Sequence, residues 1–262
     1  MGTSVNSIMA ITIYPKKEQA SGQFAAGAIK ENKPIGFPHE GGELKPFSSL
    51  FYWAHAWSDQ GGLIGEHPHQ GFEIMSFVLK GEIEHYDSQL QSWKRLRAGD
   101  MQIIRSGKGI SHAERFLPGA HIFQIWVDPD LRKTLNNPAT YSDYRADSFP
   151  ESKESGCVVR TLKGPGSPLT MNANIESIRE RRFSEGHHRI EINNKNMLGI
   201  YVTEGFLSLN EEAVGQDDFV LIKEEKEISV SNESVAGLFI IEVPDNPGYE
   251  TYANMQGISA KI

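Results

Sequence analysis

The sequence predicts an all-β protein made of two stacked antiparallel β-barrels. Three observations lead to this fold class. Short runs rich in Val, Ile, Phe, Tyr and Trp recur along the chain, Gly, Asn, Asp and Pro separate them, and the two halves of the 262 residues repeat the same order of runs. Hydrophobic residues make up 39% of the chain, which is more than a disordered segment carries.

The first half contains four runs that are predicted as strands. They cover residues 49–57, 72–79, 101–105 and 121–127. Gly71, Gly81, Gly99, Gly107 and Gly109 lie between these runs, at turns that require a positive φ. Helical signals are few: a single turn is predicted over residues 130–135 and one short helix over residues 175–183.

A polar stretch from residue 128 to about residue 174 is predicted to connect two β units, because it is dense in Pro, Ser, Asn and Asp. After it, strands are predicted over residues 197–203, 206–209, 219–222, 228–230 and 238–243. We therefore expect an N-terminal barrel over residues 1–145 and a C-terminal barrel over residues 146–262.

The two halves follow one frame, which indicates a duplicated barrel. In the first half, SFVLKGEIEHYDS is followed by LRAGDMQIIRSGKG and then by IFQIWVDP. In the second half, GIYVTEGFLSLNEEA is followed by VGQDDFVLIKEEKE and then by GLFIIEVP. Each half thus shows a strand, a glycine, a second strand, an acidic turn and a late apolar strand that ends in proline.

Charge and composition exclude several classes of function. The net charge is −8, from 26 basic and 34 acidic residues, which disfavours direct binding of nucleic acid. The one dense basic run, residues 179–182, is interpreted as a solvated helix face or turn. No apolar run approaches the ~18 residues of a membrane span. The first residues form a poor signal peptide, and we expect a cytoplasmic protein. The single cysteine, Cys157, excludes a disulfide within the chain.

Two histidine pairs suggest a metal site in the first half. His67 and His69 are two residues apart, so on an extended strand both imidazoles lie on one face. His112 and Glu114 have the same spacing at the edge of another strand-like run. Three imidazoles and one carboxylate suit iron, nickel, copper, manganese or zinc. The alternative is four polar residues on a sheet with no metal between them.

Other side chains are weaker candidates for a pocket. They are His85, Glu73, the apolar Phe72, Met75 and Phe77, and the pair Gln124 and Trp126, which share one face of their strand. His187 and His188 are expected to fall outside both barrels. No histidine follows His188, so the second barrel is expected to serve as a structural partner or a lid.

The segment HPHQGFE, the strand end EHYDS and the run GDMQIIRSGKGISHAE together closely resemble the pirin family of bicupins in the cupin superfamily. The resemblance implies two stacked cupin barrels with one Fe(II) in the N-terminal barrel. The residues that match its ligands are His67, His69, His112 and Glu114, and Glu114 rather than Glu73 is the ligand carboxylate. Gln70 and Tyr86 stand where the family usually has arginine, which removes positive charge near the rim of the site.

The same resemblance implies a quercetin 2,3-dioxygenase activity, with a small aromatic flavonol and dioxygen as substrates. Glu114 would then take the proton of the flavonol 3-hydroxyl group. An alternative is an iron-dependent, redox-sensing regulator that acts through a protein partner. A third option, an isomerase or decarboxylase for small sugars or keto acids, is disfavoured because the side chains around residues 67–77 are mainly apolar.

Overall fold

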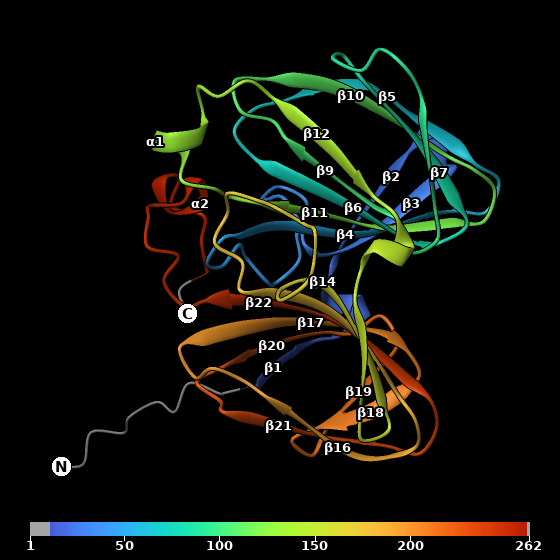
Figure 1. Cartoon of the computed structure of the whole chain (residues 1–262), viewed down its shortest axis with the longest axis vertical. Coiled ribbons are helices and arrows are strands. Elements are labelled where there is room, and N and C mark those ends of the chain that lie inside the picture. Colours follow the sequence, from blue (N-terminus) through green and yellow to red (C-terminus); the bar gives the residue numbers. More distant parts are fainter. Residues whose placement is uncertain (1–10, 261–262) are drawn as a thin grey trace.

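The computed structural model describes residues 11–260, so the interpretation of the first ten residues as a poor signal peptide lies outside the described residues. Figure 1 shows two β-rich units stacked along the long axis of the molecule. Each unit consists of a seven-stranded and a four-stranded antiparallel sheet that face each other, rather than one continuously hydrogen-bonded cylinder. The predicted all-β bicupin architecture is confirmed.

The first unit contains strands β2 to β12. Its large sheet has the order β12-β9-β6-β11-β4-β3-β2 and its small sheet the order β5-β10-β7-β8. The bounds of these strands are β2 Ala20–Phe24, β3 Ile29–Ile35, β4 Leu50–Ser58, β5 Gly62–His69, β6 Glu73–Lys80, β7 Glu82–Asp87, β8 Lys94–Arg97, β9 Met101–Arg105, β10 Ile110–Phe116, β11 Ala120–Val127 and β12 Thr140–Tyr144.

The second unit contains the remaining strands, together with the first strand of the chain. Its sheets have the orders β1-β20-β17-β22-β15-β14-β13 and β16-β21-β18-β19. The bounds are β1 Ile11–Tyr14, β13 Glu151–Glu154, β14 Cys157–Lys163, β15 Ser177–Phe183, β16 Gly186–Glu191, β17 Asn196–Glu204, β18 Phe206–Leu209, β19 Glu212–Gly215, β20 Phe219–Lys223, β21 Glu227–Asn232 and β22 Ala236–Pro244.

The described helices are short. They are α1 Leu131–Thr134, α2 Tyr252–Met255 and the 3-10 turns η1 Lys16–Glu18, η2 Ala25–Gly27 and η3 Ala146–Ser148. The predicted turn at residues 130–135 is confirmed as α1, where the side chain of Asp130 accepts from the backbone N–H of Arg132. None of the described helices is long and apolar enough to cross a bilayer.

The two seven-stranded sheets pack against each other and share one core. Alternation along β6 turns Met75 and Phe77 toward this core and turns Ile74, Ser76 and Val78 toward the interior of the first barrel. Trp53 on β4 is fully buried between the sheets. The core therefore belongs to neither half alone, and the faces of β4, β6 and β11 that point away from it are free to build a site.

The predicted repeat is present in the backbone. The turn at Gly99 and Asp100 exchanges hydrogen bonds with Val78, and the turn at Asp217 and Asp218 exchanges the same bonds with Val202. All five glycines that were predicted to have a positive φ do so. At Gly107 the requirement is also steric, because a Cβ there would lie 2.3 Å from the carbonyl oxygen of Asn137.

Three predictions were wrong. Residues 177–183 form strand β15, because they pair on both sides with β14 and β22. The basic run of residues 179–182 is therefore part of a sheet, where Arg181 reaches Glu154 at 2.8 Å. His187 and His188 lie inside the second unit, on β16, which occupies the place in its small sheet that β5 has in the first.

The polar stretch from residue 128 to residue 174 is more ordered than a connection. It contributes β12 to the edge of the first large sheet and both β13 and β14 to the second. Edge strands are often polar, so a search for apolar runs does not detect them. The domain boundary near residue 145 stays a prediction; β1, from the start of the chain, pairs with β20 of the second unit.

Candidate metal centre

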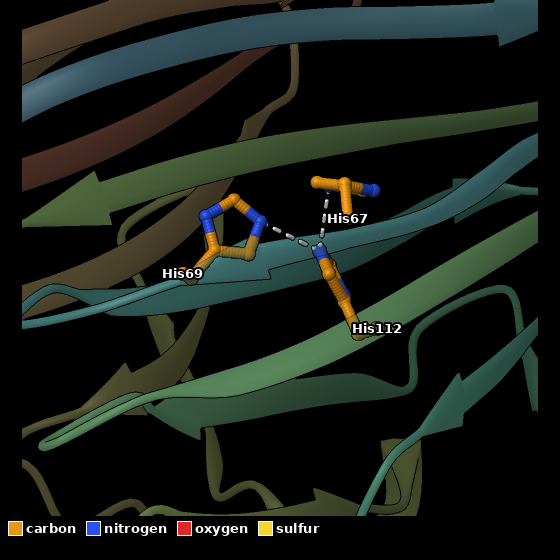
Figure 2. Close-up of side chains that lie close together, drawn as sticks. All are labelled: His67, His69 and His112. Atoms are coloured by element: carbon orange, nitrogen blue, oxygen red, sulfur yellow. Dashed lines mark hydrogen bonds between the residues drawn. The ribbon is translucent and has the colours of Figure 1, made fainter.

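Two paired strands bring three histidines together inside the first barrel. On the antiparallel strands β5 and β10, His67 lies opposite His112, and His69 lies opposite Ile110. The pairing shifts by one residue between His112 and Glu114, because Glu114 lies opposite Ile64. This bulge on β5 near Gly65 changes the direction in which the following side chains point. Figure 2 shows the three imidazoles converging on one point from these strands.

The distances between the ring nitrogens fit a metal ion. Nε2 of His112 lies 2.9 Å from Nε2 of His69 and 3.1 Å from Nε2 of His67. An ion bound at 2.0–2.1 Å with its ligands at right angles holds two nitrogens about 3.0 Å apart. Hydrogen bonds alone cannot satisfy this arrangement, because one ring nitrogen with a single proton or lone pair faces two others. A cation at the point of convergence accepts all three lone pairs.

The protonation states agree with metal binding. Burial, together with the neighbouring His67, lowers the pKa of His69 to about 4. Burial, reinforced by the other histidines, also lowers the pKa of His112 well below its usual value. Nδ1 of His67 donates to the carbonyl oxygen of Gly65 at 2.8 Å, which leaves its Nε2 as a free acceptor. The imidazoles of His69 and His112 are therefore neutral near pH 7, which is the form that binds metals.

Glu114 lies on the same strand as His112 but belongs to a second group. Its carboxylate, one nitrogen of His85 and one nitrogen of His112 lie within 4.8 Å of one another, whereas His67 and His69 are not in this group. Oε2 of Glu114 accepts from Nε2 of Gln124 at 2.6 Å, and its Oε1 accepts from Ser76 at 2.9 Å. The structure thus places the carboxylate beside His112, held by polar side chains.

These polar partners extend the site into the barrel interior. His85 is fully buried, lies 3.0 Å from a carboxylate oxygen of Asp87 and stacks on Tyr141. The hydroxyl of Tyr141 donates to Asp143 and lies 3.1 Å from Oε1 of Gln102, whose Nε2 lies 3.3 Å from Glu114. The sequence analysis missed Ser76, Gln102 and Tyr141. The signal that could have found the first two is a polar residue flanked by apolar ones within a buried strand.

Aromatic side chains form the wall beside the histidines. The ring of Trp126 meets the ring of His69 nearly edge-on, with centroids 4.7 Å apart, and Phe72 packs on Trp126. Gln124 and Trp126 share the inner face of β11, as predicted. Of the apolar candidates, Phe72 lies at this wall, whereas Met75 and Phe77 belong to the core between the barrels.

A surface cavity of about 600 Å³ leads toward His69. Its rim includes Gln70, Ser88 and Lys108, and the side-chain amide of Gln70 donates to the carbonyl oxygen of Lys108. Its size is within the range of small-molecule sites. The cavity thus offers polar groups beside His69.

Glu73 has a different role. Its buried carboxylate accepts from the backbone N–H groups of Asn172 and Ala173 at 2.7–2.9 Å, and from the side chain of Asn172. It fastens the segment before β15 to the first barrel.

Comparison with known proteins finds similar sequences. The Pirin family matches residues 29–127. The chain is 27% identical to a quercetin 2,3-dioxygenase of Escherichia coli over 184 residues, which covers 69% of this chain and 76% of that protein. It is 27% identical to human pirin over 168 residues, which covers 63% of this chain and 53% of pirin.

Solved structures share the fold. The bacterial pirin YhhW from Escherichia coli, in complex with nickel(II), has a TM-score of 0.70 at 22% identity and covers 89% of this chain and 99% of that chain. A quercetin 2,3-dioxygenase from Acinetobacter baumannii has a TM-score of 0.76 at 20% identity, and the match covers 91% of this chain and 80% of that chain. The matching segment and the named relatives make this chain similar to the pirin family over residues 29–127, and the solved structures share its fold.

Proposed function

We propose that this protein is a metal-dependent dioxygenase that acts on a flavonol-like substrate of the quercetin type. The observation that carries the proposal is the convergence of Nε2 of His67, His69 and His112, at the spacing of metal ligands. Relatives that bear the name quercetin 2,3-dioxygenase support the reaction class. The cytoplasmic location expected from the sequence remains part of the proposal.

The proposed ion is Fe(II), held by the three histidines with Glu114 as the fourth ligand. The resemblance to the pirin family supports iron, whereas a histidine and carboxylate set also accepts nickel, copper, manganese or zinc. When bound, the ion supplies Lewis acidity and redox chemistry toward dioxygen.

Glu114 is the proposed base. Its carboxylate is fully buried and acceptor-only when ionised, so an oxygen atom of this group can take the proton of the flavonol 3-hydroxyl. Gln124 and Ser76 hold the two oxygens in place. Replacing Gln124 would free the oxygen that this amide now engages.

The wall of Trp126 and Phe72 is the proposed platform for the flat rings of the substrate, since aromatic faces stack on aromatic ligands. Gln70 and Lys108 at the rim offer partners for its peripheral hydroxyl groups. Burial of His112 and Glu114 keeps bulk water from the reacting position.

Oxygen uptake by the Fe(II)-reconstituted protein with quercetin tests the proposal. His67→Ala and Glu114→Ala should abolish uptake. His187→Ala, which removes an exposed histidine on the matching strand of the other barrel, is the matched control and should keep it. Metal content is measured in every sample. Wild-type protein with one iron per chain and no uptake would contradict the dioxygenase and direct attention to a protein partner.

A further inference from the structure

A large cavity lies between the two barrels, on the opposite face of β4 and β11 from the candidate metal centre. Its volume is about 780 Å³, and residues of both units line it. On β11, His121 and Phe123 point into it, while Gln124 and Trp126 point into the first barrel. The candidate metal centre makes no use of this cavity.

A chain of four polar side chains crosses from the second barrel to the first at this cavity. The hydroxyl of Tyr201 donates to Oδ1 of Asp217 at 3.0 Å. Nδ1 of His55 lies 3.2 Å from the same hydroxyl, and Nε2 of His55 lies 3.3 Å from Nδ1 of His121. Lys16 holds the other oxygen of Asp217 at 2.7 Å.

The hydrogen bonds that link these four side chains can have only one donor-to-acceptor direction. A carboxylate accepts and does not donate, so Tyr201 must give its hydrogen to Asp217 and accept one from Nδ1 of His55. A neutral His55 then has a lone pair on Nε2, and His121 must donate to it from Nδ1. Burial lowers the pKa of His55 to about 4 and also lowers that of His121, which keeps both rings neutral. This series of hydrogen bonds therefore ends at a lone pair on Nε2 of His121.

The backbone at Asp217 supports a role for its side chain. This residue has a φ of 72°, a conformation that favours glycine, and the equivalent turn of the first barrel has Gly99 there. At this position the carboxylate of Asp217 accepts from the hydroxyl of Tyr201 and from the ammonium group of Lys16.

The charges that line the cavity balance, because four side chains are basic and four are acidic: Lys80, Arg160, Arg181 and Arg182, and Glu151, Glu180, Glu204 and Asp217. Arg160 reaches Glu180 at 3.1 Å, and Arg182 reaches Glu204 at 3.2 Å. Phe123 adds an aromatic surface. A neutral ligand fits such a lining better than an ion. We infer that the cavity is a second small-molecule site, which binds a neutral hydroxylated aromatic compound through a hydroxyl hydrogen donated to Nε2 of His121.

The donor-to-acceptor direction of these hydrogen bonds is tested by ¹⁵N NMR of the histidine rings in metal-free protein at pH 7.5. His55 and His121 should both carry their hydrogen on Nδ1, whereas free histidine prefers Nε2. Tyr201→Phe removes only a hydroxyl and should abolish the Nδ1–H form of His55. A hydrogen on Nε2 of His121 in the wild type would overturn the inference.

Binding is tested with resorcinol, a neutral dihydroxybenzene that chelates metals poorly, on the same metal-free protein. Saturable shifts of the His55 and His121 resonances are expected. His121→Phe should weaken binding about tenfold, the usual effect of one lost hydrogen bond, and His67→Ala should not weaken it. 1,3-Dimethoxybenzene, which has no hydroxyl hydrogen, should bind at least tenfold more weakly than resorcinol. The absence of saturable shifts, or equal binding of the two probes, would refute the site, whatever the outcome for the proposed dioxygenase.

Discussion

The core between the barrels predicts that the two halves unfold as one unit. The fully buried ring of Trp53 packs against Phe123 of its own large sheet, and against Phe219 and Phe239 of the facing one, with centroids 5.2–5.6 Å apart. Trp53→Ala removes a ring that both sheets contact. Truncation of a buried aromatic residue to alanine costs about 3–5 kcal/mol of the free energy of unfolding.

The chain offers a separate probe for each half. All four tryptophans, at positions 53, 57, 93 and 126, lie in the first half, and the single cysteine, Cys157, is buried on β14 of the second. Urea unfolding is followed by tryptophan fluorescence and by the reactivity of the Cys157 thiol. With a slope of about 3 kcal/mol per molar urea, Trp53→Ala should lower both midpoints together by roughly 1–1.7 M.

Trp93→Ala is the matched control. Its ring is 39% exposed and contacts Arg115, so its loss should cost under about 1 kcal/mol. A fluorescence midpoint that falls in Trp53→Ala while Cys157 keeps its wild-type midpoint would refute the shared core. A fragment of residues 1–145 that folds fully and binds metal would refute it as well.

Three further predictions concern a buried acid, an anchored segment and the metal. Burial raises the pKa of Asp128 to about 6, so the folded state keeps a proton that the unfolded chain releases near pH 4, and this stabilisation is lost as the pH rises through 6. Asp128→Asn should therefore raise stability at pH 7.5 by up to about 3 kcal/mol and flatten the pH profile of the urea midpoint; an unchanged profile would contradict this. Glu73→Gln replaces the acceptor of Asn172 and Ala173 and should cost about 2–4 kcal/mol, with faster proteolysis at residues 164–176; wild-type cleavage rates would count against it. Ni(II) or Fe(II) at 100 times its Kd should stabilise the wild type by about 3 kcal/mol in thermal melts, and an equal gain in His112→Ala would argue against the site.

Strands with apolar faces on both sides could be predicted from the sequence, and strands at the edges could not. β9 matches the predicted residues 101–105, because four of its five side chains are buried. β18 matches the predicted residues 206–209 through its apolar residues, of which Leu207 and Leu209 are buried. β13 is exposed along its whole length, so its composition is that of a loop. β15 carries alternating charges that pair with neighbouring strands, and only those neighbours make it a strand.

The candidate site divides in the same way. The spacing of His67 and His69 predicts a common face, because that relation is local to one strand. Their approach to His112 depends on the pairing of β5 with β10 and on the bulge near Gly65. The placing of Glu114 beside His85 depends on the pairing of β10 with β7, where these two residues lie opposite each other. The register between two strands depends on the tertiary structure, so the polar network behind the histidines could not be predicted from the sequence.

The duplicated fold also explains why only one barrel offers metal ligands at this place. The small sheets correspond strand by strand, so β16 and β21 occupy the positions of β5 and β10. In the second barrel, however, the buried side chains of these strands are Ile190, Ile228 and Val230, which pack into an apolar core, and Asn232 at the end of β21. His187 is exposed because it has the opposite parity to Ile190. His188 has the parity of Ile190 but is only half-buried, and its two ring nitrogens lie 3.1 and 2.9 Å from the carbonyl oxygens of Ser155 and Ser184. A histidine pair on a strand therefore indicates a metal site only where the ring nitrogens converge on one point, as those of His67, His69 and His112 do on β5 and β10.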